Sequence, residues 1–186
     1  EADKLDGVII GTPNHLHCKP AVELMKRGIT VALEKPLAST VKDCKKIFKT
    51  SLETGVKTQI GFVLRNTPFY RTVKDLLNQN KVGKIISIEA DELVGFAVSN
   101  TVFRGWRRDL KKLGGTLLEK CCHDIDLINW FVESRPLKIN SFGGKSIFNS
   151  NLLLPDKCEN CQYKDKCNYV YEKGESRLEE EQNHNL

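Results

Sequence analysis

The sequence predicts an α/β protein whose N-terminal part forms a parallel sheet. Short β-branched runs alternate there with segments of helical periodicity at close intervals, which is typical of parallel strands joined by right-handed crossovers. The chain has 186 residues, enough for one sizeable domain or two small ones. Its 40% hydrophobic and 28% charged residues are ordinary for a globular protein, so composition alone indicates no function.

The first predicted elements are a strand, a helix and a second strand. Residues 6–11 form a β-branched run that ends in a turn signal, as expected of a buried parallel strand. A helix is predicted from Thr12 to about Arg27, where Gly28 is placed to end it. Residues 29–33 are predicted to be the next strand of the same sheet.

The second helix of the parallel part begins with a capping signal. Thr40 and Asp43 have the spacing of a capping box, in which each residue satisfies a backbone donor of the first helical turn. Apolar residues follow at helical spacing: Val41, Cys44, Ile47 and Phe48. Residues 56–64 are predicted to be another apolar strand.

The pattern changes after the third strand, and we place a domain boundary near Asn66. A helix is predicted to start at Thr67-Pro68, with Gly83 after its end. Its predicted apolar side consists of Phe69, Val73, Leu76 and Leu77. Residues 85–93 alternate in part, as in a half-buried strand, and residues 94–113 are predicted to be a loop.

The last elements suggest the start of a second domain. A helix is predicted over residues 117–132, and a strand with a Gly-Gly interruption over residues 137–148. The predicted division is residues 1–65 for an incomplete parallel unit, 66–150 for a partial α+β domain, and 151–186 for a Cys-rich loop and tail. The tail from Glu172 onward is rich in Glu and Asn, and we expect it to be disordered.

Charge and hydropathy favour a protein free in the cytoplasm. The net charge is +5, and the basic residues are scattered along helices such as residues 42–49, which favours solvated helix faces over a nucleic-acid surface. No apolar run approaches the roughly 20 residues that cross a bilayer, and residues 1–6 do not resemble a signal peptide. Seven cysteines without a secretory signal suggest reduced thiols.

Polar residues follow the first two predicted strands and form the first candidate site. They are residues 11–17, Gly-Thr-Pro-Asn-His-Leu-His, and residues 34–36, Glu-Lys-Pro. The carboxyl ends of parallel strands are where open α/β sheets bind ligands. Thr12 and Asn14 are suited to hydrogen-bonding a ribose or an amide. Lys35 could polarise an oxygen or deliver a proton if its acidity is tuned, and a loop lysine before a proline is the alternative.

A second candidate site lies on the helix that follows Gly114-Gly115. Glu119 and His123 are four residues apart and therefore share a helix face. Asp126, three residues further on, is placed to orient the imidazole. A carboxylate beside a histidine is a plausible general-base pair for a substrate hydroxyl, and an ordinary salt-bridged histidine is the alternative.

Three closely spaced cysteines form a third candidate. Cys158, Cys161 and Cys167 have the look of a metal knuckle that could hold zinc or an iron–sulfur cluster. A tetrahedral site needs a fourth ligand, for which His184, Cys121 and Cys122 are candidates. Three free thiols are the alternative.

Taken together, these segments resemble the Gfo/Idh/MocA oxidoreductases. The order of the motifs matches that family over residues 6–148, and Phe62 and Arg65 lie where the family's strand leaves the nucleotide domain. Residues 8–17, Gly28 and residues 31–38 resemble the second half of its Rossmann domain. The segments that resemble its substrate-domain motif are Trp106-Arg107, Gly114-Gly115 and residues 119–126.

The resemblance implies an NAD- or NADP-dependent oxidoreductase. Such enzymes transfer a hydride between a carbinol carbon, often of a sugar or cyclitol, and the nicotinamide. Lys35 would handle a proton and His123 would contact the substrate hydroxyl, with Glu119 and Asp126 in support. Glu119 occupies a position where many members carry aspartate. The residues implied to line the cofactor are Thr12, Pro13, Asn14, His17, Glu34 and Lys35.

The resemblance also implies parts that these 186 residues do not contain. The family fold opens with a glycine-rich turn that holds the pyrophosphate, and its second domain contains an open antiparallel sheet that pairs subunits. We therefore expect this chain to be a fragment, or to need other polypeptide. Two other functions stay open: a non-catalytic binding or regulatory relative, and an NAD-dependent glycosidase that leaves the nicotinamide unchanged after each turnover.

Overall fold

The computed structural model describes residues 5–95, 105–144, 158–167 and 170. These residues fall into two compact units. Of the described residues, 5–94 and 105–135 belong to the first unit, and 95, 136–144, 158–167 and 170 belong to the second. All contacts of the candidate active site described below lie within the first unit.

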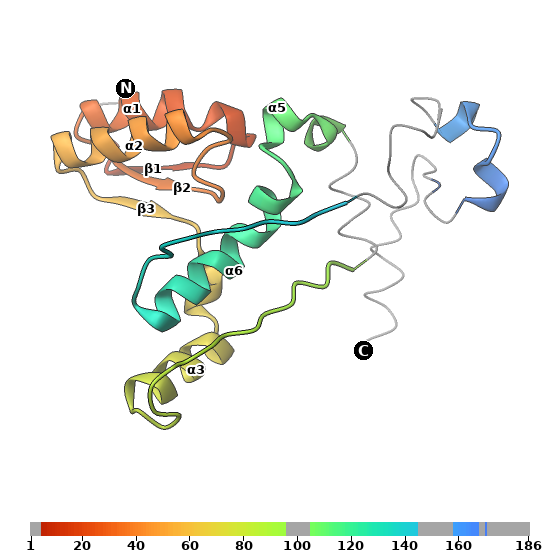
Figure 1. Cartoon of the computed structure of the whole chain (residues 1–186). Helices are drawn as coiled ribbons and strands as arrows, with labels where there is room; N and C mark the ends of the chain where they lie inside the picture. Colours follow the sequence, from red (N-terminus) through yellow and green to blue (C-terminus); the bar gives the residue numbers. More distant parts are fainter. Residues whose placement is uncertain (1–4, 96–104, 145–157, 168–169, 171–186) are drawn as a thin grey trace. The chain divides into compact units, whose positions relative to one another are not determined.

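The first unit contains a three-stranded parallel sheet, as predicted. Its strands are β1 (Gly7–Ile10), β2 (Thr30–Leu33) and β3 (Thr58–Ile60), in the spatial order β1-β2-β3. Ile10 pairs with Leu33, and Leu33 pairs with Ile60. The strands therefore end at the same edge, and the turns that follow them lie next to each other (Figure 1).

Two helices cover one face of this sheet. They are α1 (Cys18–Lys26), preceded by a short 3₁₀ turn η2 (Asn14–Leu16), and α2 (Val41–Thr54), and they lie side by side (Figure 1). Strand residues alternate between the two faces of the sheet. Ile10 is 4% exposed beneath the helices, whereas its neighbour Ile9 is 81% exposed on the opposite face. The core is therefore the layer between helices and sheet.

The predicted start of α2 and the predicted end of α1 are confirmed. The Thr40 hydroxyl accepts a hydrogen bond from the backbone N–H of Asp43 at 3.1 Å, at the start of α2. Gly28 follows the end of α1 with a φ of 79°, a conformation that glycine adopts without strain. The predicted strand at residues 56–64 is shorter than expected, because only Thr58–Ile60 pairs with β2. Val63–Asn66 forms a 3₁₀ turn, η3, instead.

Helix α3 (Pro68–Asn78) begins where predicted, but its buried side differs from the predicted apolar side. Phe69 and Leu76 are exposed, whereas Lys74 is buried. The Lys74 Nζ donates to the carbonyl oxygen of Trp130 at 2.9 Å and to Glu133 Oε1 at 2.7 Å. Lys74 is tolerated inside because two oxygens at the end of another helix satisfy its ammonium.

Two predicted strands are absent from the described residues. Residues 85–93 and 137–144 run without strand pairing, and residues 145–148 of the second prediction lie outside the described part of the chain. A strand is stabilised only by a hydrogen-bonded neighbour. Among the described residues, neither segment has such a neighbour. The α/β class is thus confirmed, and the predicted antiparallel sheet is not seen in these segments.

The loop predicted over residues 94–113 contains helical turns where it is described. These are the 3₁₀ turn η4 (Gly105–Arg108) and α5 (Leu110–Leu113), whose N-terminus is capped by Asp109. Helix α6 (Thr116–Val132) then follows, one residue earlier than predicted.

Gly114 joins α5 to α6 at a point of close approach. Its φ is 87°, and a Cβ there would lie 2.5 Å from Leu118 Cδ2 and 2.9 Å from the carbonyl oxygen of Ser39. Only glycine therefore allows α6 to reach the loop after β2. The predicted boundary near Asn66 stays a prediction, and the tail predicted from Glu172 lies outside the described residues.

Candidate active site

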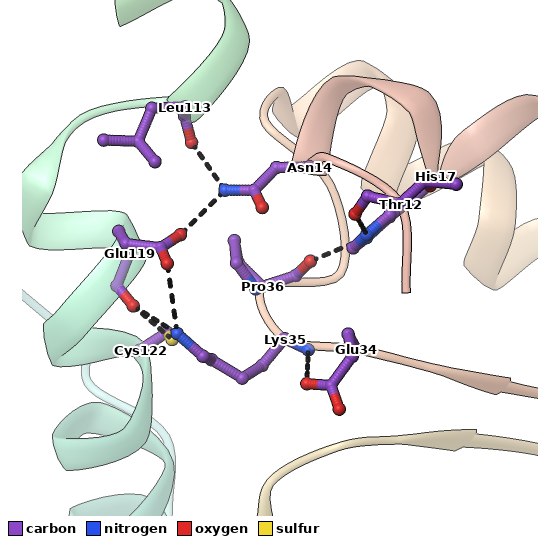
Figure 2. A network of polar contacts seen from close by, with 9 residues as sticks. All are labelled: Thr12, Asn14, His17, Glu34, Lys35, Pro36, Leu113, Glu119 and Cys122. Atoms are coloured by element: carbon purple, nitrogen blue, oxygen red, sulfur yellow. Dashed lines mark hydrogen bonds and ion pairs between the residues drawn. The ribbon is translucent and has the colours of Figure 1, made fainter. Parts of the chain in front are cut away.

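The candidate site is centred on an ion pair between Lys35 and Glu119. Lys35 follows β2, and Glu119 lies in the first turn of α6. The Lys35 Nζ donates to the Glu119 carbonyl oxygen at 2.8 Å and lies 3.4 Å from Glu119 Oε1 (Figure 2). Glu119 is buried and Lys35 is partly buried, so the pair is shielded from solvent and is screened less by salt than a surface pair.

Asn14 donates the second hydrogen bond to the Glu119 carboxylate. Its Nδ2 donates to Glu119 Oε2 at 2.8 Å and to the carbonyl oxygen of Leu113 at 3.0 Å (Figure 2). Each Glu119 oxygen therefore has a donor, which a buried carboxylate requires. Asn14 was expected to hydrogen-bond a ribose or an amide. The structure instead uses its amide N–H groups inside the protein, because the carboxylate on α6 lies beside it.

His17 braces the two turns that carry these residues. It is fully buried, with Nε2 at 2.7 Å from the carbonyl oxygen of Thr12. Its Nδ1 lies 3.1 Å from the carbonyl oxygen of Pro36 (Figure 2) and 3.3 Å from that of Leu37. The prediction that His17 lines a cofactor stays a prediction, and the contacts that the structure describes for its ring are with backbone carbonyls. Its ring is enclosed by the backbone of the turns after β1 and β2, and it fixes one turn against the other.

Thr12 and Glu34 remain at the open edge of the sheet. Both are exposed, and Pro13 is partly buried between Thr12 and Asn14. The backbone N–H of Lys35 donates to Glu34 Oε2 at 3.3 Å. A Cβ on Gly61, which follows β3, would lie 3.2 Å from the same Glu34 oxygen. This edge of the sheet therefore carries polar side chains in the turns after β1 and β2, and a glycine without a side chain in the turn after β3.

His123 lies on α6 one turn beyond Glu119. Its ring meets the Phe62 ring edge-on, with centroids 5.9 Å apart and an interplanar angle of 76°. Among the described residues, its buried Nδ1 has no hydrogen-bond partner. Burial lowers the pKa of His123 below its ordinary value, and the positive charge of Lys35 lowers it further. The imidazole is therefore neutral at pH 7.

The predicted carboxylate–histidine arrangement differs from the observed one. Glu119 and Asp126 share a helix face with His123, but the Glu119 carboxylate is used by Lys35 and Asn14. Asp126 was expected to orient the imidazole and instead binds Arg65. Arg65 Nε donates to Asp126 Oδ2 and Nη2 to Oδ1, both at 2.6 Å. The prediction failed because the turn after β3 brings a guanidinium, a stronger partner, to that carboxylate.

The cysteine motif does not form a metal cluster in the described residues. There, no three His, Cys, Asp or Glu side chains gather closely enough to hold a metal ion, and Cys158 and Cys161 are among those searched. Cys158–Asn160 and Lys164–Lys166 form short 3₁₀ turns of the second unit. His184 lies outside the described residues. Metal binding by Cys158, Cys161 and Cys167 therefore stays a prediction.

Two thiols near the candidate site are protonated. Burial raises the pKa of Cys121 and of Cys122 above the ordinary thiol value. The Cys122 Sγ donates to the Glu119 carbonyl oxygen at 3.7 Å, the same oxygen that Lys35 contacts (Figure 2). These thiols are poor metal ligands in this state, because the thiolate is the form that binds metal.

No helix in the described part of the chain has the length and apolar character that a membrane span requires.

Two protein-family models match most of the chain. One is described as an oxidoreductase family with an NAD-binding Rossmann fold, and it matches residues 1–62. The other is described as the C-terminal alpha/beta domain of the same kind of oxidoreductase, and it matches residues 74–169. The second match alone exceeds half of the 186 residues.

Curated relatives with similar sequences include three bacterial proteins. A putative oxidoreductase, YteT, of Bacillus subtilis is 25% identical over 89% of this chain and 40% of its own length. A 2,7-anhydro-N-acetylneuraminate hydratase of Mediterraneibacter gnavus is 28% identical over 76% of this chain and 37% of its own length. An inositol 2-dehydrogenase of Rubrobacter xylanophilus is 28% identical over 71% of this chain and 35% of its own length. The chain thus spans 40% or less of the length of these relatives.

Solved structures of sugar and cyclitol dehydrogenases share the fold. A levoglucosan dehydrogenase in complex with NADH and levoglucosan has a TM-score of 0.63 and 29% identity, over 68% of this chain and 35% of that one. An apo scyllo-inositol dehydrogenase from Lactobacillus casei has a TM-score of 0.55 and 26% identity, over 72% and 39%.

Proposed function

The chain belongs to the Gfo/Idh/MocA oxidoreductase family, and on this premise we propose that it carries the proton-transfer residues of an NAD- or NADP-dependent oxidoreductase. The proposed reaction is the reversible oxidation of an alcohol on a sugar-like molecule or cyclitol. The observation that carries the proposal is the shielded Lys35–Glu119 pair at the carboxyl edge of the sheet, with His123 one turn further along α6. Relatives named as inositol and levoglucosan dehydrogenases support this substrate class.

The residues at the sheet edge fit a nicotinamide cofactor. Thr12 and Glu34 are exposed polar side chains beside the carboxyl ends of β1 and β2, where open α/β sheets bind nucleotides. The Glu34 carboxylate can accept hydrogen bonds from ribose hydroxyls, and the missing side chain of Gly61 lets that carboxylate lie close to the backbone after β3. When bound, the cofactor would exchange a hydride at its nicotinamide with the carbinol carbon.

Lys35 would hold and polarise the substrate oxygen. An ammonium has three N–H donors, and Glu119 accepts from Lys35 Nζ through its carbonyl and its carboxylate. The remaining donor can point to a substrate oxygen at the carboxyl edge of the sheet. The Lys35 ammonium would stabilise negative charge that develops on that oxygen or donate a proton to it.

His123 would accept the hydroxyl proton. Its neutral imidazole at pH 7 is the form that a general base requires, and its lowered pKa follows from burial and from the charge of Lys35. Lys35 and His123 therefore offer complementary groups: an ammonium that donates and an imidazole nitrogen that accepts. This supports an active enzyme over a purely regulatory relative.

A second candidate reaction involves no net oxidation. One relative is named a hydratase, and adding or removing water leaves the substrate's overall oxidation level unchanged. An NAD-dependent glycosidase would share that property. Product analysis separates these candidates, because only a net oxidoreductase changes the amount of reduced nicotinamide as product forms.

The test of the proposal is a titration of NADH and NADPH into the purified protein, followed by nicotinamide fluorescence. We expect saturable binding that Lys35→Ala weakens about tenfold or more, because the lysine ammonium is lost from the crevice. Lys49→Ala is the matched control, since Lys49 is an exposed lysine on α2 that pairs with Glu53, which is also exposed. A folded protein that binds neither nucleotide contradicts the proposal, as does equal weakening by both variants.

A further inference from the structure

We propose that Arg65 is a positioning residue for the proposed reaction, because its two hydrogen bonds to Asp126 fix the helix that carries His123. The inference rests on the proposed role of His123 as proton acceptor. Arg65 itself lies in η3, the turn after β3, and binds α6 across 61 residues of sequence.

The geometry of the pair is bidentate. Nε and Nη2 of Arg65 each donate to a different oxygen of Asp126, at 2.6 Å. The Asp126 side chain is 13% exposed and that of Arg65 is 40% exposed. The guanidinium also lies over the Trp130 ring, 5.4 Å from its centroid. A planar guanidinium with two hydrogen bonds fixes the direction of the contact as well as its distance. It therefore fixes the rotation of α6 about its axis and its position along that axis at Asp126.

Arg65 acts at the middle of one stripe of α6. The stripe has helical spacings of four, three, four and three residues, so all its members face the same way. Its members, in order, are Glu119, His123, Asp126, Trp130 and Glu133. Their partners all precede α6 in the chain: Asn14 and Lys35 contact Glu119, Phe62 contacts His123, Arg65 contacts Asp126 and Trp130, and Lys74 contacts Glu133.

One short turn therefore contacts the stripe twice. Phe62, which precedes η3, packs edge-on against the His123 ring, and Arg65 binds Asp126 one turn further along α6. Phe62 contacts the ring itself, edge-on, and makes no hydrogen bond to it. The Arg65 pair supplies the two hydrogen bonds that fix α6, and thereby the backbone from which His123 projects.

The pair also affects the charge around His123. The charged groups that act on it are Lys35 on the turn after β2, Asp124 and Asp126 on α6, and Glu92 beyond α3. The three carboxylates raise the pKa of His123, whereas burial and Lys35 lower it. The Arg65 guanidinium offsets the negative charge of Asp126. It thereby helps to keep the imidazole neutral, the form that accepts a proton.

A purely structural role for Arg65 makes a different prediction. Lys74 provides the comparison, because it is buried, faces the same stripe and binds Glu133 at 2.7 Å. Its partner Glu133 lies ten residues beyond His123 and is not among the groups that act on that imidazole, whereas Asp126, the partner of Arg65, is. Loss of either cation should loosen α6, but only loss of Arg65 should change the ionisation of His123.

The experiment is an NMR titration of the protein labelled with ¹⁵N-histidine, with the His123 signal assigned through His123→Gln. We expect Arg65→Gln to move the His123 midpoint to higher pH, because Asp126 is no longer neutralised. Arg65→Lys keeps a positive charge and should stay near the wild-type midpoint. Lys74→Gln should leave the midpoint unchanged. An unchanged midpoint in folded Arg65→Gln overturns the proposal, as does an equal shift in Lys74→Gln.

A second variant covers the case in which Arg65→Gln does not fold. Asp126→Asn keeps the size of the side chain and can still accept a hydrogen bond from Arg65, so the helix contact is partly retained. We expect its His123 midpoint to move to lower pH, because a negative charge is removed. No movement overturns the proposal.

Kinetics of Arg65→Lys separate positioning from binding. A single-point ammonium cannot replace the fork, so we expect kcat to fall by about tenfold with little change in KM for the alcohol. A change in KM alone contradicts a positioning role.

These measurements also distinguish this inference from the proposed function. The NMR titration needs neither cofactor nor substrate. A shifted His123 midpoint in a protein that binds no nicotinamide would keep the coupling of Arg65 to His123 and reject the redox function. Nicotinamide binding with an unshifted His123 midpoint would keep the redox function and reject the coupling of Arg65 to His123.

Discussion

Lys35 and Glu119 lie 84 residues apart in the sequence, and two contacts join them: Lys35 Nζ donates to the Glu119 carbonyl oxygen at 2.8 Å and lies 3.4 Å from its carboxylate. One residue belongs to the segment matched by the nucleotide-binding family model and the other to the segment matched by the C-terminal model. The candidate site is therefore made where the turns of the parallel sheet meet the first turn of α6. The predictions below test this meeting point.

The first prediction concerns the charge of Glu119. Glu119→Gln leaves the Lys35 ammonium half-buried without its counter-charge and turns an amide N–H towards the donors of Lys35 or Asn14. We expect the free energy of unfolding to fall by about 1–3 kcal/mol, measured by urea denaturation. Glu53→Gln is the control, because its pair with Lys49 is exposed and should cost no more than about 0.5 kcal/mol. Equal losses in the two variants would show that the Lys35–Glu119 pair has no special role in stability.

The second prediction concerns the contact at Gly114. Gly114→Ala places a Cβ 2.5 Å from Leu118 and 2.9 Å from the Ser39 carbonyl oxygen, in addition to the strain of a φ of 87°. Gly28→Ala carries similar strain at a φ of 79° but has open space around the added methyl group. Both should be destabilised, the control by about 1 kcal/mol and Gly114→Ala by at least about 1–3 kcal/mol more. Thermal unfolding measures both, and similar melting temperatures would contradict the close approach.

The third prediction is the pH dependence that His123 gives to stability. Its pKa is lowered on folding, so between the unfolded value of about 6.5 and the lower folded value the unfolded state binds more protons. At pH 7 and above, His123 is neutral in both states and does not change the free energy of unfolding. As the pH falls below about 6.5, the free energy of unfolding decreases, and the decrease ends once the pH is below the folded pKa. His123→Gln should remove that part of the loss, measured by denaturation at a series of pH values. The same slope in both proteins would rule out a lowered pKa.

The fourth prediction concerns the helix cap at Thr40. Its hydroxyl accepts a hydrogen bond from the Asp43 N–H at 3.1 Å at the start of α2. Thr40→Ala leaves that donor to solvent and should lower the free energy of unfolding by about 1 kcal/mol. Ser51→Ala is the control, since the Ser51 hydroxyl donates to the Phe48 carbonyl oxygen within α2 and caps nothing. Its effect should stay within about 0.5 kcal/mol, and guanidinium titrations compare the two.

Local patterns were sufficient for the parallel part of the fold. The strands at β1 and β2, the cap at Thr40 and the helix end at Gly28 all follow from short-range chemistry: β-branched runs, a hydroxyl at a helix start, and a glycine that tolerates positive φ. Such signals span only a few residues, so the sequence displays them directly. The same holds for α6, whose existence and length were predicted to within one residue.

Local patterns were misleading where a partner decides the outcome. Residues 85–93 alternate as a strand would, but alternation indicates a strand only if a neighbouring strand pairs with it, and among the described residues none does. The apolar side predicted for α3 failed for a related reason. Lys74 is buried because the end of α6 offers a carbonyl and a carboxylate, and neither is visible in the sequence of α3.

By itself, the sequence determined the family, the α/β class and the residue types of the site, because motifs such as Glu34-Lys35-Pro36 and Glu119 to Asp126 are contiguous along the chain. Only the tertiary structure decided which side chains meet. In the fold, Asn14 hydrogen-bonds Glu119, and His17 is enclosed by backbone carbonyls. Asp126 binds Arg65 and not His123. These pairs are 19 to 105 residues apart in sequence, apart from the local His17–Thr12 contact. A carboxylate takes the strongest donor that the fold brings within reach, and that choice depends on packing and not on spacing.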